Sequence, residues 1–109
     1  QLAAEALAKE GVETEILDLR CIVPLDKERI LTSVAKTGRC VIVAEAARTC
    51  SFASEIAANL AEEGLLTLLA PVQRVTGYDT VVPLARLEQH YMPSKQRIIA
   101  AAKNALAFA

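Results

Sequence analysis

The feature that most constrains the fold of this sequence is a continuous apolar run at residues 40–44, Cys-Val-Ile-Val-Ala, which Glu45 closes. Unbroken runs of Val and Ile are typical of short strands that are buried on both faces, as in a parallel sheet. Parallel strands need crossover connections, and these are usually helices. The run therefore predicts a parallel sheet with helices packed against it.

Helical and strand-like patterns alternate along the rest of the chain. Apolar spacing predicts helices over residues 2–10, 27–36, 52–63 and 85–91 and from residue 95 onward, and strands over residues 13–19, 40–45 and 71–76. The expected helix ends are the N-caps Asp26 and Ser94 and the terminating glycines Gly11, Gly38 and Gly64. This order favours a three-layer α/β/α fold with a mainly parallel, Rossmann-like sheet. Such a sheet is thin, and we expect it to lack a first strand that would precede residue 1.

The first and last predicted helices each carry an apolar stripe that should face inward. In the first helix the stripe consists of Leu2, Ala3, Ala6 and Leu7, and in the last helix of Ile98, Ile99, Ala102, Ala105 and Leu106. These spacings fit one face of a helix with 3.6 residues per turn. We expect both stripes to pack against the sheet.

Composition narrows the classes of protein and partner. The 109 residues suffice for one domain, and 53% of them are apolar, so the chain is not of the disordered type. The net charge is −1 and no basic stripe is present, which argues against a nucleic-acid partner. No apolar stretch approaches the roughly 20 residues of a membrane span. Residues 1–10 lack the apolar core of a signal peptide, so a cytoplasmic location is expected.

The cysteines and the single histidine give little support for a metal site or a nucleophile. Cys21, Cys40 and Cys50 form no Cys-x-x-Cys pair, and His90 lies far along the chain. Reduced thiols are the simpler interpretation, although spacing alone leaves a disulfide open. Cys50 lies near a predicted helix start, where a thiol pKa can fall, and a Cys50–His90 pair is a minor alternative.

The loop at residues 45–51 is the strongest candidate for a binding site. Ligands of open parallel sheets bind beyond the carboxyl ends of the strands, and helix N-termini attract anions. Glu45, Arg48, Thr49 and Ser51 lie in this loop, between a strand and a helix, and could bind a small anion or contact another subunit. The loop has no glycine with which to wrap a phosphate as a P-loop does. Helix capping and subunit contact are therefore favoured over anion binding.

Several blocks of the sequence resemble a known family. Asp-Leu-Arg at residues 18–20 followed by Pro-Leu-Asp at 24–26, then Lys-Thr-Gly-Arg at 36–39, resemble the transketolase C-terminal domain family. Ala-Pro-Val-Gln-Arg-Val-Thr-Gly-Tyr-Asp at 70–79 and Tyr-Met-Pro at 91–93 resemble more specifically the β subunit (E1β) of thiamine-diphosphate-dependent 2-oxo acid dehydrogenases. The blocks occur in order and cover nearly the whole chain.

The resemblance implies an assembly role without chemistry of its own. Residues 1–109 would form one domain, the C-terminal part of a longer E1β chain. The whole enzyme would decarboxylate a 2-oxo acid with thiamine diphosphate and Mg²⁺ and reductively acylate a lipoyl group on E2. Its partners would be the E1 α subunit, a second E1 β subunit and the E2 lipoyl acyltransferase. Because the cofactor lies elsewhere in such enzymes, no catalytic, cofactor-binding or metal-binding residue is expected here.

The chain departs from the family pattern at three places. Ala44 stands where a His is usual, Cys50-Ser51 replaces a glycine-rich turn, and Leu69 stands where an acid often helps to dock the basic binding domain of E2. By the resemblance, Leu69 and Phe108 mark the expected E2-docking surface, although a leucine cannot pair with Lys or Arg.

Two other functions compete with this interpretation. One is a stand-alone Rossmann-like module, without catalytic activity, that binds a small anion near Arg48 and Thr49. The other is a transketolase-type enzyme acting on carbohydrate phosphates, against which the block at residues 70–79 argues. A domain built for permanent assembly should expose apolar surface, for which residues 1–10 and 105–109 are the candidates.

Overall fold

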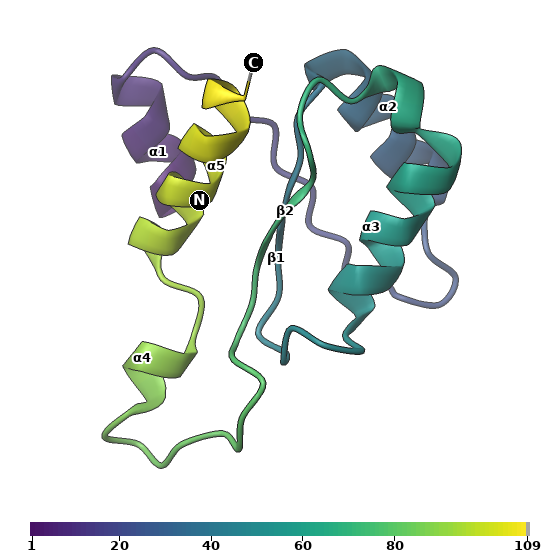
Figure 1. Cartoon of the computed structure of the whole chain (residues 1–109). Helices are drawn as coiled ribbons and strands as arrows, with labels where there is room; N and C mark the ends of the chain where they lie inside the picture. The colour runs from purple at the N-terminus through teal and green to yellow at the C-terminus, as the bar shows by residue number, and fades with distance from the viewer. Residues whose placement is uncertain (109) are drawn as a thin grey trace.

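The computed structural model describes residues 1–108, which form a small mixed α/β structure (Figure 1). In chain order its elements are α1 (Leu2–Lys9), α2 (Lys27–Thr37), β1 (Val41–Val43), α3 (Phe52–Glu63), the 3-10 helix η1 (Leu65–Thr67), β2 (Gln73–Val75), α4 (Glu88–Tyr91) and α5 (Lys95–Ala107). The predicted helices are all present, within a few residues of their expected bounds.

The sheet consists of β1 and β2, which pair in parallel as predicted. Val41 lies opposite Gln73 in the register. The ladder extends at both ends, because Gln73 N–H donates to the Cys40 carbonyl and Ala44 N–H donates to the Val75 carbonyl, each at 3.0 Å. The prediction of a strand at residues 13–19 is wrong. This segment pairs with no neighbouring strand within residues 1–108, and a strand is defined by such pairing.

Helices lie on both sides of the two strands (Figure 1). On one side α5 contacts both strands and α1 packs against α5, while on the other side α3 contacts β1 and α2 packs against α3. The second side holds a core of buried apolar side chains, namely Ile30, Val34, Ile42, Ala53, Ile56 and Leu60. Leu60 is 0% exposed and is the largest apolar side chain that is fully buried.

The predicted helix caps at Asp26 and Ser94 are confirmed. The Asp26 carboxylate accepts a hydrogen bond from Arg29 N–H, and the Ser94 hydroxyl accepts one from Arg97 N–H, both at 3.2 Å. Gly38 ends α2 with φ of 76°, a left-handed conformation that glycine adopts without the steric cost of a side chain. These local signals set the helix ends as expected.

The inward faces of α1 and α5 differ in part from the prediction. Leu2 is 66% exposed, although its spacing placed it on the buried stripe of α1. On α5 the buried residues are Ala101 and Ala105, whereas Leu106 is exposed. On α1 the buried residues are Ala3 and Leu7, as predicted, and α1 packs against α5.

Candidate functional site at the carboxyl ends of the strands

The loops that follow β1 and β2 meet, as expected for the carboxyl ends of neighbouring parallel strands. Gly77 N–H donates to the Ala46 carbonyl at 2.8 Å. Thr49 N–H donates to Asp79 Oδ1 at 2.8 Å, and the Thr49 hydroxyl donates to Asp79 Oδ2. These hydrogen bonds from Thr49 favour the charged carboxylate and hold the pKa of Asp79 below its usual range. Thr49 and Asp79 thus clasp the two loops together.

Two arginines reinforce this contact through backbone carbonyls. The Arg48 guanidinium donates to the Arg74 carbonyl at 3.4 Å, and the Arg74 guanidinium donates to the Arg48 carbonyl at 3.1 Å. Arg74 also donates to Ser54 Oγ on α3 at 2.7 Å. Charge-assisted hydrogen bonds of this kind are stronger than neutral ones. The loop after β1 is therefore tied to both β2 and α3.

A third arginine reaches the same end of the sheet from α5. Arg97 Nη2 donates to the Thr76 carbonyl at 2.6 Å, and Arg97 Cζ lies 4.8 Å from the centroid of the Tyr78 ring. That separation permits a cation–π interaction. Sequence reasoning missed Arg74 and Arg97, because their distant position along the chain gives no local signal of this contact.

Two of the candidate residues in the loop at 45–51 form hydrogen bonds with other groups of the protein. Both donors of Thr49 bind Asp79, and Arg48 binds a backbone carbonyl. Ser51 precedes α3 but makes no side-chain capping bond, so the expected capping is wrong there, and its buried hydroxyl has no partner within residues 1–108. Glu45 is exposed. This arrangement stabilises the loop and leaves few donors that could converge on an anion.

The alternative Cys50–His90 pair gains no support from the geometry. Cys50 is an exposed free thiol with φ of 58°. His90 is exposed on α4, and no hydrogen bond joins the two side chains in the described part of the chain. A nucleophile needs a base within hydrogen-bond reach.

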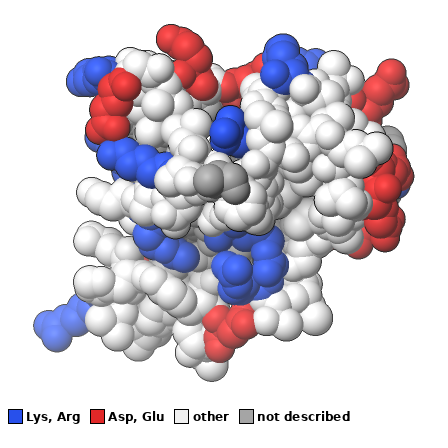
Figure 2. Space-filling model, turned by 45° about the horizontal axis from the view of Figure 1, so that its top comes forward, with Lys and Arg blue, Asp and Glu red and all other residues white. Residues whose placement is uncertain are grey.

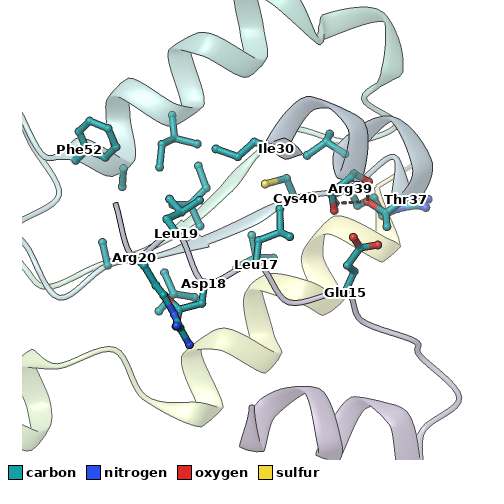
Figure 3. A pocket seen from close by; sticks show the side chains of 18 of the residues that line it. Glu15, Leu17, Asp18, Leu19, Arg20, Ile30, Thr37, Arg39, Cys40 and Phe52 are labelled. Carbon is teal, nitrogen blue, oxygen red and sulfur yellow. Dashed lines mark hydrogen bonds and ion pairs between the residues drawn. The ribbon is translucent and has the colours of Figure 1, made fainter. Parts of the chain in front are cut away.

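A cavity of about 490 Å³ lies between residues 15–22 and the free edge of β1 (Figure 3). Leu17 and Leu19 line one wall, Val41 and Val43 line the other, and Phe52 of α3 closes part of it. We call this cavity the slot. Most of the residues that line it are apolar.

Comparison with known proteins assigns the chain to a family. Residues 1–98 match the family described as Transketolase, C-terminal domain. The chain belongs to this family. The β subunit of the pyruvate dehydrogenase E1 component of Staphylococcus epidermidis is 43% identical over 106 residues, which cover 97% of this chain and 33% of the relative. The corresponding subunit of Staphylococcus aureus is 42% identical over the same shares. The chain thus spans a third of the length of these curated relatives.

The residues of this transketolase C-terminal domain do not fit a thiamine diphosphate and Mg²⁺ site. Within residues 1–108, no three His, Cys, Asp or Glu side chains lie close enough to hold a metal ion. Asp79 is bound by Thr49, and Glu15 pairs with Lys36, which lowers the pKa of Glu15. Among the described helices, none is long and apolar enough to cross a membrane.

The two residues expected at a docking surface lie near the opposite end of the sheet. Leu69 is 60% exposed and Phe108 is 52% exposed. The turn between α2 and β1 connects their segments, since Leu69 N–H donates to the Gly38 carbonyl at 2.7 Å and Arg39 Nε donates to the Ala105 carbonyl at 3.0 Å. Figure 2 brings this end forward and shows uncharged surface between scattered Lys, Arg, Asp and Glu side chains.

Proposed function

We propose that this chain is the C-terminal domain of the β subunit of a 2-oxo acid dehydrogenase E1 component. The identity of 43% over 97% of the chain with a pyruvate dehydrogenase E1 β subunit carries this proposal. The whole enzyme would decarboxylate a 2-oxo acid oxidatively and pass the acyl group to lipoyl-E2. Thiamine diphosphate and Mg²⁺ would bind outside these residues, and the domain would serve in assembly and in docking E2.

The segment between β2 and α4 supports a role in assembly. Val81 is 87% exposed and Leu84 is 89% exposed, and Val82 and Leu87 are also exposed. Apolar side chains grouped on one loop are typical of surfaces that a partner covers. We propose that the E1 α subunit or the second E1 β subunit covers this loop, with the loop at residues 45–51, which includes Glu45, as part of the same contact.

The docking role would fall to Leu69 and Phe108. Both are exposed, and neither carries charge, so an E2 lipoyl acyltransferase would bind here through apolar contact. Apolar anchors at the centre of an interface usually dominate its binding energy.

The assembly role is tested in the full-length polypeptide, expressed together with an E1 α subunit. Native mass spectrometry measures the α2β2 tetramer, and pyruvate-dependent ferricyanide reduction measures decarboxylation. We expect the double substitution Val81→Asp and Leu84→Asp to abolish the tetramer, because buried unpaired carboxylates are costly. The matched control Leu66→Asp changes a fully exposed leucine outside this loop and should leave the tetramer intact. A tetramer that tolerates the double substitution contradicts the proposed contact.

The docking role is tested by the affinity of the assembled E1 for the isolated subunit-binding domain of E2. Phe108→Ala should weaken binding about tenfold, which corresponds to about 1.4 kcal/mol. Leu69→Asp should also weaken binding, because a carboxylate would replace an apolar contact. The control is Leu2→Ala, which changes an exposed residue of α1. If neither Phe108→Ala nor Leu69→Asp changes the affinity, E2 docks elsewhere.

A further inference from the structure

Residues 80–90 extend beyond the carboxyl ends of the strands, between β2 and α5 (Figure 1). We call this segment the arm. All of its residues are exposed except Pro83, which is half-buried. Within residues 1–108, the backbone hydrogen bonds of the arm join only its own residues and those directly beside it. The conformation of the arm therefore depends on how its two ends are held.

Polar contacts fix the first end of the arm, which follows β2. Asp79 accepts hydrogen bonds from Thr49, and the Arg97 guanidinium lies 4.8 Å from the centroid of the Tyr78 ring. Arg97 also donates to the Thr76 carbonyl at 2.6 Å. The partners lie in the loop after β1 and on α5, so two other segments of the domain hold this end in place.

One aromatic side chain fixes the second end of the arm. Tyr91 is the last residue of α4, and it is 5% exposed. Its ring lies directly against Gly77, because a Cβ at Gly77 would be 2.5 Å from Tyr91 Cζ, which is closer than such atoms approach. Gly77 precedes the arm and Tyr91 follows it, so this contact brings the two ends together. Compact surface loops with close ends, the Ω-loops, are frequently functional.

The exposed side chains of the arm indicate what the contact between Tyr91 and Gly77 is for. Val81, Val82, Leu84 and Leu87 all point their apolar side chains at solvent. A loop that is free at one end has many conformations, and ordering it on binding costs conformational entropy. A loop that is held at both ends presents its apolar side chains in one arrangement before a partner binds.

We propose that the contact between Tyr91 and Gly77 positions the arm for the neighbouring subunit of the E1 tetramer. The proposal rests on the assembly role proposed above. Tyr91 is a positioning residue, because its ring is buried against Gly77 while the exposed side chains of Val81 and Leu84 would touch the partner. Its effect on assembly is expected to come from the aromatic ring that packs on the glycine.

The dissociation constant of the tetramer tests the positioning role. It is measured by native mass spectrometry on dilution of the full-length β polypeptide assembled with an E1 α subunit. Tyr91→Ala should raise the dissociation constant about tenfold or more. Tyr91→Phe keeps the ring and should leave it unchanged. The matched control is Val34→Ala in the core of α2, at a side chain that is also 5% exposed, and it should lower the thermal midpoint without weakening the tetramer.

The outcomes separate the positioning role from the assembly role. If the double substitution Val81→Asp and Leu84→Asp leaves the tetramer intact, the arm is no contact surface and both proposals are wrong. If that double substitution abolishes the tetramer but Tyr91→Ala does not weaken it, only the positioning role is wrong. An equal loss of affinity in Val34→Ala would also contradict the positioning role, because Tyr91 would then act through overall stability.

Gly77→Ala tests the same contact from its other side. Gly77 does not have the positive φ of Gly38, and the three atoms nearest to a Cβ at Gly77 all belong to Tyr91. The added methyl group should therefore act through the ring and weaken the tetramer as Tyr91→Ala does. The variant with both substitutions should be no weaker than Tyr91→Ala alone. If the two fold-changes multiply instead, the residues act independently and the proposal fails.

Hydrogen exchange on the free full-length β polypeptide reports on the arm in the absence of a partner. Tyr91→Ala should speed the exchange of the His90 and Met92 amides, which donate to carbonyls of residues 87 and 88. The Ala44 amide, which bonds β2, should exchange as in the unchanged protein. If exchange at His90 and Met92 does not change either, other contacts hold the arm, and Tyr91 does not position it.

Discussion

The two edges of β1 differ in their backbone pairing within residues 1–108. Toward β2 the edge is closed by a parallel ladder, and polar clasps tie the ends of the two strands. Toward residues 13–19 the edge borders the slot, and only side chains connect the two walls. Apolar residues of similar type line both edges. The difference shows that backbone pairing, and not apolar sequence alone, makes a segment a strand.

Apolar side chains in the core and along the slot also differ in how deeply they are buried. In the core, Leu60 is fully buried, and Val75 of β2 is nearly so. Along the slot Leu17 and Leu19 are only partly buried, although they pack against the core formed by α2 and α3. Two leucines that differ in burial should therefore contribute different amounts to the free energy of unfolding of residues 1–109.

The largest expected effect compares the cost of two substitutions. One is made at a fully buried leucine of the core, and the other at a partly buried leucine that lines the slot. Leu60→Ala should lower the free energy of unfolding of residues 1–109 by about 2–5 kcal/mol, because a fully buried side chain leaves a cavity. Leu17→Ala should cost less than about 1.5 kcal/mol, since its side chain already borders open space and the walls of the slot can relax. Urea denaturation measures both values. The comparison between the edges fails if the two substitutions cost the same.

Much of the closed side could be predicted from the sequence. The unbroken run at residues 40–44, the caps at Asp26 and Ser94 and the glycine at Gly38 are local signals, and each has the expected structure. The approach of Thr49 to Asp79 agrees with the rule that the carboxyl ends of parallel strands lie together.

The open side could not be predicted in the same way. Residues 13–19 have the composition of a strand, yet within residues 1–108 no strand pairs with them. Arg74 and Arg97 were missed for a related reason. Their roles depend on carbonyls of distant segments, which no spacing within the sequence reveals.

A smaller effect is expected at the turn that leads into β1. Gly38 has φ of 76°, and a Cβ there would lie 2.6 Å from Leu69 Cδ1, whereas Gly11 has φ of 83° and open space around it. Both Gly→Ala substitutions should cost about 1–2 kcal/mol for the left-handed conformation. Gly38→Ala should cost more because of the contact with Leu69, and adding Leu69→Ala should remove the excess. Thermal unfolding measures each variant, and equal costs for Gly38→Ala and Gly11→Ala would show that Leu69 moves aside freely.

The smallest expected effect concerns pH and the clasp between the loops after β1 and β2. Hydrogen bonds from Thr49 lower the pKa of Asp79 in the folded protein, so the charged carboxylate stabilises the fold above its unfolded pKa. This stability is lost as pH falls through the lower, folded pKa. Thr49→Val removes the hydroxyl donor and should therefore lower the thermal midpoint near pH 6, and by less near pH 2, because protonation of Asp79 removes the charged acceptor as pH falls. Thr80→Val, at an exposed neighbouring threonine, should leave the pH dependence unchanged. If Thr49→Val lowers the midpoint equally at both pH values, the hydroxyl acts through packing, and the closed end of the sheet does not depend on the charge of Asp79.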